Sequence, residues 1–157
     1  MFGELNTAET DQLLRRQLIG RIGCHDNDTT YVVPVSYAYD GTYVYVHTYE
    51  GKKMDMMRKN PSICFQVDDT RSFASWQSAV CWGQFEELST EEQKREAQKI
   101  LNARILPMLT SETMQLSELW PFPAGDDENL KGIYFRIRLT EKTGRFEKSD
   151  QPGFLVV

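Results

Sequence analysis

Three consecutive segments alternate between apolar and polar side chains with a period of two, and they restrict which folds this chain can adopt. The segments span residues 19–24, 31–39 and 43–47, and this period is typical of β-strands that bury one face. The polar run Asp26-Asn27-Asp28 joins the first pair, and Asp40-Gly41 joins the second. Because Asp-Gly favours the positive φ angles of a tight hairpin, the pattern predicts an antiparallel meander.

The remainder of the chain adds further strands and a small number of helices. Strand character resumes in three segments: residues 62–68, 78–88 and 133–146. Helices are predicted over residues 10–17, 51–60 and 89–103, the first with a threonine cap at residue 7 or 10. An irregular excursion at about 105–130 includes a short predicted helix at 112–119. Six strands with two to four peripheral helices predict a mainly β fold, in the form of a small antiparallel barrel.

Pro34 lies inside the second predicted strand. Proline has no N–H group, so it cannot donate a hydrogen bond to a neighbouring strand. We therefore expect Pro34 at a sheet edge, at a bulge or at a gap in the strand pairing. A gap would leave the backbone groups of neighbouring residues available to a ligand.

Length and charge limit the classes of partner that the chain can have. The 157 residues predict one domain over residues 1–157. The net charge of −5, with Lys and Arg dispersed among more numerous acids, argues against nucleic-acid binding. No segment approaches the roughly 20 apolar residues that span a bilayer, and the first residues do not resemble a signal peptide. We therefore expect a cytoplasmic protein that does not contact membranes.

The stretch from Tyr45 to Lys53, which leaves a predicted strand and opens a predicted helix, is the strongest candidate for a binding site. Lys52 and Lys53 follow Gly51 at the helix start, where unpaired backbone N–H groups and the positive end of the helix dipole favour an anion, above all a phosphate. The alternative is that both lysines form a solvated helix start. His47 and Thr48 could reach the same ligand, or His47 could be a structural hydrogen-bonding residue.

Several other kinds of chemistry lack the residues that they require. His25 and His47 are the only histidines, so a site with several histidine ligands cannot form and no metal ligands are expected. The sequence contains no Gly-x-Ser-x-Gly elbow, Gly-x-Gly-x-x-Gly loop or P-loop motif, which argues against a serine hydrolase and the common nucleotide sites. The cysteines are far apart and flanked by apolar residues, so we expect reduced core thiols at Cys24, Cys64 and Cys81.

Five groups of residues between about residues 10 and 104 occur in a recognisable order: Arg21-Ile22-Gly23; Val32-Val33-Pro34-Val35-Ser36-Tyr37 with Tyr39-Asp40-Gly41; Val46-His47-Thr48 with Gly51-Lys52-Lys53; Arg58-Lys59-Asn60-Pro61; and Cys64-Phe65-Gln66-Val67-Asp68. Together they resemble the flavin-binding split-barrel family related to pyridoxamine 5′-phosphate oxidase, and within it the nitroimidazole-resistance-type branch. The resemblance implies a six-stranded antiparallel split barrel with Greek-key-like topology. It also implies a homodimer that binds FMN in two grooves at the subunit interface.

The resemblance further implies roles for individual residues in an FMN site. Lys52 and Lys53 would bind the phosphate, backbone groups of residues 32–37 would face the isoalloxazine ring, and Ser78 would come from the fifth strand. His47 matches a histidine near the flavin edge in the nitroimidazole-resistance-type branch, so it is the candidate catalytic residue for substrate contact or proton supply. The expected cofactor-binding set is Val32, Val33, Pro34, Val35, Ser36, Val46, His47, Thr48, Lys52, Lys53 and Ser78.

Three positions depart from the oxidases of this family. Val32 stands where they carry an arginine, Tyr37 where they carry a lysine that reaches the substrate, and Ser78 where they carry a glutamine. Their C-terminal tryptophan and arginine signature is not recognisable, although Arg145 could supply one arginine near the flavin. We therefore do not expect pyridoxamine 5′-phosphate oxidase activity itself.

The resulting expectation is an FMN-dependent oxidoreductase. It would pass electrons from NADH or NADPH through FMN to a small acceptor such as a nitro compound, a quinone or another flavin. Two alternatives stay open. The same barrel could store or sense a flavin, a haem or a related cofactor without turnover, or it could serve protein interaction alone.

Overall fold

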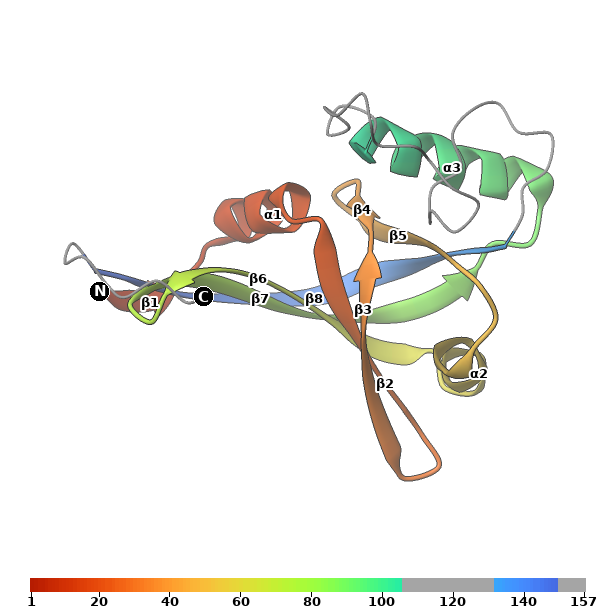
Figure 1. The fold of residues 1–157 in the computed structure, drawn as a ribbon, viewed down its shortest axis with the longest axis horizontal. Helices are drawn as coiled ribbons and strands as arrows, with labels where there is room; N and C mark the ends of the chain where they lie inside the picture. Colours follow the sequence, from red (N-terminus) through yellow and green to blue (C-terminus); the bar gives the residue numbers. More distant parts are fainter. Residues whose placement is uncertain (106–131, 150–157) are drawn as a thin grey trace, which may run out of the picture.

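One antiparallel sheet forms a split barrel with helices packed on its surfaces (Figure 1). The computed structural model describes residues 1–105 and 132–149. Within them the elements are β1 (Phe2–Glu4), α1 (Thr7–Arg16), β2 (Ile19–Asp26), β3 (Thr29–Ser36), β4 (Ala38–Tyr39), β5 (Tyr43–Thr48), α2 (Lys52–Lys59), β6 (Ser62–Ser72), β7 (Ser75–Glu87), α3 (Glu91–Ile105) and β8 (Ile133–Lys148).

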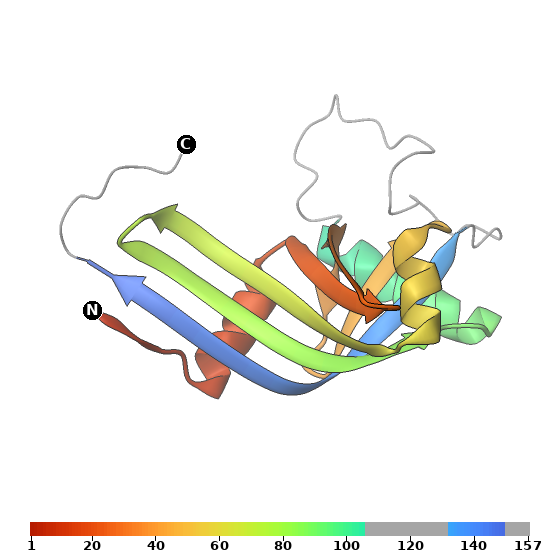
Figure 2. The same ribbon diagram turned by 90° about the horizontal axis from the view of Figure 1, so that it is seen from below.

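The strands are ordered β3-β2-β6-β7-β8-β5-β4, and β1 pairs with β8 outside this path. Every pairing is antiparallel. The long strands β6, β7 and β8 run side by side and extend past the barrel as a curved arm (Figure 2). The predicted mainly β fold with antiparallel strands is confirmed.

The predicted number of six strands is too low, because the described part of the chain contains eight. One addition is β1, whose three residues are too few for an alternating pattern to show. The other arises at Tyr37, where the segment predicted as a single strand over residues 31–39 leaves β2 and joins β5. The segment therefore forms two strands, β3 and β4.

Two hairpins turn at residues that accept positive φ angles. Asn27 and Asp28 have φ angles of 48° and 59° between β2 and β3, in the manner of a type I′ turn. Gly41, with a φ angle of 104°, lies between β4 and β5. The carboxylate of Asp40 accepts hydrogen bonds from the backbone N–H groups of the two residues after Gly41, at 2.9 and 2.7 Å, which closes the turn.

The helices differ in how they begin. The side chain of Asn6 accepts a hydrogen bond from the N–H of Glu9, and the carboxylate of Glu9 accepts one from the N–H of Asn6, both at 2.8 Å. This capping box starts α1, so the cap is Asn6 rather than a threonine at residue 7 or 10. At the start of α3, Thr90 accepts a hydrogen bond from the N–H of Gln93. Helix α2 follows Gly51 and has no side-chain cap.

The main hydrophobic core lies between the sheet and the helices α1 and α2. Three methionines of α2 point into this core: Met54, Met56 and Met57. A smaller cluster lies between α3 and the strands β4, β5 and β8. Of the cysteines, Cys24 and Cys81 are buried free thiols, whereas Cys64 is half-buried beside an outer groove, so the prediction of a core thiol is wrong for Cys64.

Two sequence predictions fall outside the described residues, namely the irregular excursion at 105–130 and the short helix at 112–119 within it. Among the helices that the structure describes, none has the length and apolar character required to cross a membrane.

Candidate functional site

The barrel is split between two strand edges that approach each other without pairing. Strand β3 ends the sheet and pairs with β2 alone, with Pro34 opposite Arg21. Strand β5 pairs with β8 throughout, but with β4 only at Val44 and Tyr45. In the described part of the chain, residues 46–48 therefore have a strand on one side only. Backbone groups along both edges are available to a ligand, and the predicted edge position of Pro34 is confirmed.

Tyr37 fixes the point where the two edges separate. Its side chain is 1% exposed, and its hydroxyl donates a hydrogen bond of 2.6 Å to the carbonyl of Leu14. Leu14 lies in the last turn of α1, where backbone carbonyls have no partner within the helix. The ring also packs edge-on against Phe65. Burial raises the pKa of Tyr37 above its usual range, so the hydroxyl stays protonated and remains a donor.

The first turn of α2 brings two ammonium groups to the β2–β3 side of the split. The Nζ atom of Lys52 lies 5.2 Å from the ring centre of Tyr31 on β3, which is a cation–π contact. Lys53 is half-buried, and burial lowers the pKa of its ammonium group. Gly51 has no side chain to cap the first N–H groups of α2. The helix start and both lysines therefore favour a negative charge at this position.

These groups suit a ligand in which an anionic group is attached to a planar apolar ring system. A bound phosphate would return to Lys53 some of the stabilisation that burial removes, and the N–H groups of the first helical turn would donate to it. The adjoining edge strand presents apolar side chains, with Val32 62% exposed and Val33 half-buried. The split thus offers cations at one end. Along its length the strand edge offers apolar side chains and unpaired backbone groups that can form hydrogen bonds.

His47 occupies a different face of β5 from Val46. Its ring is 5% exposed and lies 4.5 Å from the ring centre of Tyr134 and 5.5 Å from that of Tyr49. Val46 belongs to the main core, whereas Tyr134 belongs to the cluster beneath α3. The backbone of His47 lies on the edge of the split, but its imidazole packs toward Tyr134. That His47 and the lysines meet on one ligand stays a prediction.

Gly132 lies directly against the imidazole ring of His47. A Cβ atom at Gly132 would lie 2.6 Å from the Nε2 atom of His47, and its φ angle of 85° also favours glycine. Sequence reasoning missed this neighbour, because Gly132 directly follows the irregular excursion and carries no local signal.

Ser78 lies away from the split. It is on β7, which β2 and β6 separate from β3 in the sheet order. Its hydroxyl accepts a hydrogen bond of 3.3 Å from Gln66, whose amide also contacts Asp68, and Asp68 forms an ion pair with Arg21 at 2.9 Å. Sequence reasoning did not identify this polar row, although alternating polar residues in β6 are its signal.

The outer face of the same strands carries an apolar groove of about 450 Å3. Trp82, 41% exposed, and Val32 line it together with Cys64. Gly23 makes room there, because a Cβ atom at that position would lie 2.5 Å from the sulfur of Cys64. Sequence reasoning did not predict an exposed Trp82, since a tryptophan in an alternating strand is normally assigned to the core.

The fold and the site together define a split-barrel protein with an anion-favouring helix start beside the split. A family model described as pyridoxamine 5′-phosphate oxidase matches residues 6–146. Because this match covers most of the chain, the protein belongs to the pyridoxamine 5′-phosphate oxidase family, as the sequence motifs predict.

Individual relatives and solved structures are similar to this chain over most of its length. An uncharacterized protein of Rhizobium meliloti (strain 1021) is 28% identical over 127 residues, which cover 81% of this chain and 83% of that protein. A crystal structure of a FAD-binding protein from Mesorhizobium loti has a TM-score of 0.72 and 26% identity, over 94% of this chain and 99% of that chain. A proposed 5-nitroimidazole antibiotic resistance protein from Bacteroides thetaiotaomicron has a TM-score of 0.70 over 93% of this chain and 87% of that chain; at 20% identity it shows the shared fold alone.

Proposed function

We propose that this protein is an FMN-binding flavoprotein that passes electrons from NADH or NADPH through FMN to a small acceptor, such as a nitro compound, a quinone or another flavin. The observation that supports this most is the position of Lys52 and Lys53, at an uncapped helix start beside two unpaired strand edges. The Mesorhizobium loti neighbour, which is named a FAD-binding protein, supports a flavin as the class of ligand.

In this proposal the chain binds and orients the cofactor with residues from both sides of the split. Lys52 and Lys53 hold the phosphate, together with the N–H groups of the first turn of α2. Backbone groups of residues 32–36 and 46–48 orient the ring system, and His47 contacts the substrate or supplies a proton. When bound, FMN supplies the electron-transfer chemistry, while the barrel fixes its orientation and excludes water.

The proposal includes a homodimer with the flavin at its interface. Ser78 is separated from β3 by two strands, so it joins the site only from a second copy of the chain. The outer groove beside Val32 and Trp82 offers an apolar surface on which that copy docks.

A visible absorption spectrum and two matched variants test the cofactor. The protein should carry FMN near stoichiometry with the protomer. Replacing Lys52 and Lys53 by Ala removes two charge-assisted contacts, worth about 1.5–3 kcal/mol each, and should weaken FMN binding by at least about a hundredfold. Replacing Lys94 and Lys99 of α3 by Ala changes the net charge equally and should leave binding unaltered. A colourless protein that does not bind added FMN would contradict the proposal.

One observation favours a second candidate, a non-catalytic protein that stores or senses a flavin or a haem. The imidazole of His47 is almost fully buried against aromatic rings, so it is packed as a structural residue is. Anaerobic mixing of the FMN-loaded protein with NADH or NADPH separates the two functions. Bleaching of the flavin absorbance supports the oxidoreductase, whereas tight FMN binding without reduction by either nicotinamide supports storage.

A further inference from the structure

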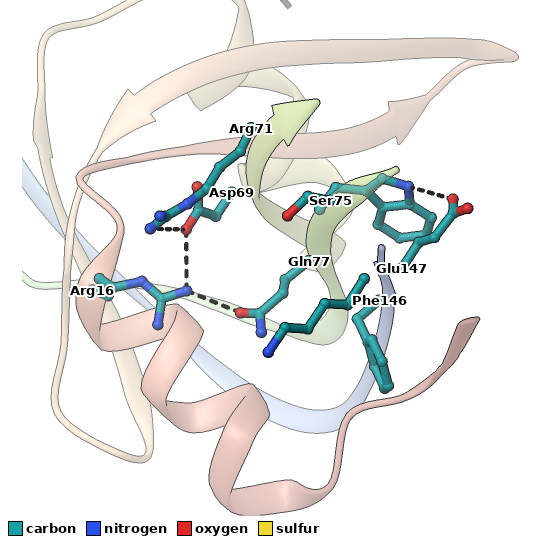
Figure 3. A pocket seen from close by; sticks show the side chains of 9 residues that line it. Arg16, Asp69, Arg71, Ser75, Gln77, Phe146 and Glu147 are labelled. Carbon is teal, nitrogen blue, oxygen red and sulfur yellow. Dashed lines mark hydrogen bonds and ion pairs between the residues drawn. The ribbon is translucent and has the colours of Figure 1, made fainter. Parts of the chain in front are cut away.

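A second pocket lies between the last turn of α1 and the arm (Figure 3), and this end of the arm is far from α2 (Figure 1). Its volume is about 380 Å3, and its walls come from α1, β6, β7 and β8. No residue of β3, β5 or α2 lines it, so within one protomer it is separate from the split.

Positive charge exceeds negative charge in this pocket, which reverses the sign of the whole chain. Three cationic side chains line it, from Arg16, Arg71 and Lys148, against the two carboxylates of Asp69 and Glu147. The chain as a whole has a net charge of −5. A local surplus of cations that comes from three separate segments favours an anionic ligand.

The arginines of the pocket are incompletely paired. Arg16 and Arg71 share a single oxygen, Oδ2 of Asp69, at 3.4 and 3.5 Å. Elsewhere the arginine–glutamate pairs Arg58–Glu87 and Arg136–Glu86 close to 2.7 Å. One carboxylate oxygen at these longer distances satisfies two guanidinium groups poorly. The pocket therefore retains the capacity to bind a second anion.

The polar side chains around the pocket are oriented by their neighbours. Arg16 donates a hydrogen bond of 2.9 Å to Gln77, and Figure 3 shows its guanidinium group turned between Asp69 and Gln77. The indole N–H of Trp76 donates a hydrogen bond of 3.1 Å to Glu147. This carboxylate is therefore already paired with a neutral donor. Trp76 and Phe146 add aromatic surface to the lining. An anchored guanidinium group with a second, incompletely paired one beside aromatic rings suits a planar molecule that carries an anionic group.

We propose that this pocket binds a small organic anion, a carboxylate or a phosphate ester carried on a planar ring. Arg16 and Arg71 contact the anionic group, and Phe146 contacts the ring. Within one protomer the pocket is separate from the split that would hold the flavin, so it provides a second place at which a small molecule can act on this protein.

Isothermal titration calorimetry of the full chain, with and without excess FMN, tests the pocket with three probes. We expect phenyl phosphate or benzoate to bind with a Kd on the order of 1 mM or lower, and the tighter of the two identifies the anionic group. Inorganic phosphate should bind at least tenfold more weakly than phenyl phosphate, because it lacks the ring. Equal affinity for these two would indicate an adventitious ion only and would overturn the proposal, as would no binding by any probe.

Two variants assign the binding to these residues. Arg71 is 75% exposed, so Arg71→Gln should fold normally and weaken the better probe at least fivefold, and addition of Arg16→Gln should weaken it further. The matched control is Arg95→Gln, which breaks an exposed ion pair with Glu91 within α3 and should leave affinity unchanged. Unchanged affinity in the pocket variants would overturn the proposal. A change in oligomeric state without a change in affinity would show instead that the surface is a contact between copies.

Discussion

Tyr37 shows how one buried hydroxyl can fix the place where two strand edges separate. Its hydrogen bond to Leu14 joins the end of α1 to the position where the chain stops pairing with β2 and begins to pair with β5. In the oxidases that the sequence resembles, a lysine at this position reaches the substrate. Here the side chain is buried in the core, so its hydroxyl links α1 to the sheet rather than contacting a ligand.

Replacing Tyr37 by Phe should therefore destabilise the protein. The ring stays in place, but the carbonyl of Leu14 loses its partner in a buried environment, which costs about 1–3 kcal/mol. Urea unfolding measures this loss. Tyr49→Phe is the control, because Tyr49 is 50% exposed and water can replace what its hydroxyl contacts. Equal losses in the two variants would show that the Tyr37 hydroxyl has no special structural role.

His47 marks the limit of prediction at the scale of single residues. Its position at the end of a strand follows from the alternating pattern, and so does its location on the same face as Tyr45. The direction of its imidazole depends on Tyr134 and Gly132, which lie far along the chain. By contrast, the lysines of α2 are found from sequence because their signal is local: a glycine, two cations and a helix start.

Among the elements, α2 is held in place by a double clamp at its C-terminal end. Arg58 donates two hydrogen bonds of 2.8 Å to Glu50, in the loop before α2, and two of 3.0 and 2.7 Å to Glu87 at the end of β7. Hydrogen bonds from Arg58 hold the pKa values of Glu50 and Glu87 below their usual range. This clamp positions the helix whose first turn carries Lys52 and Lys53.

The clamp predicts how stability depends on pH. Carboxylates with depressed pKa values stabilise the folded state above their unfolded pKa of about 4.3, and this contribution is lost as the pH falls through the lower folded values. The difference in free energy of unfolding between wild type and Arg58→Gln should be largest near neutral pH, and it should shrink below about pH 4. Added salt should reduce it too, because the groups are exposed. A difference that is the same at both pH values would contradict the clamp.

Local signals predict the hairpin turns and the approximate helix ranges, because Asp-Gly and Asn-Asp act over a few residues, but the cap of α1 is Asn6 and not the predicted threonine. The division of β3 from β4 depends on which strand lies beside Tyr37, and no local pattern contains that information. The predicted strands at residues 62–68 and 78–88 are too short for a related reason. Residues 69–72 and 75–77 are mostly polar, yet they belong to β6 and β7 and pair across the hairpin.

At the scale of the whole molecule, the sheet has a filled inner face and an outer face that is only partly covered. The inner side chains of β2, β6 and β7 join the main core: Ile22, Cys24, Ile63, Phe65, Val67, Ala79 and Cys81. On the outer side, Val32 and Trp82 border a groove of about 450 Å3. An apolar surface of this kind on a monomer is typical of an interaction site. In the proposed function Ser78 reaches the flavin site of a second copy, so a second copy is the occupant of the groove that this function requires.

Introducing a negative charge into the groove should therefore separate the dimer. Trp82→Glu and Val32→Glu each place a carboxylate where apolar side chains would meet, and an unpaired buried charge costs several kcal/mol. In sedimentation velocity experiments we expect wild type to sediment as a dimer and both variants as folded monomers that retain less FMN. Ala8→Glu, at an exposed position of α1, changes the charge equally and should remain dimeric. A monomeric wild type, or variants that stay dimeric with full FMN retention, would show that this face is not the dimer interface.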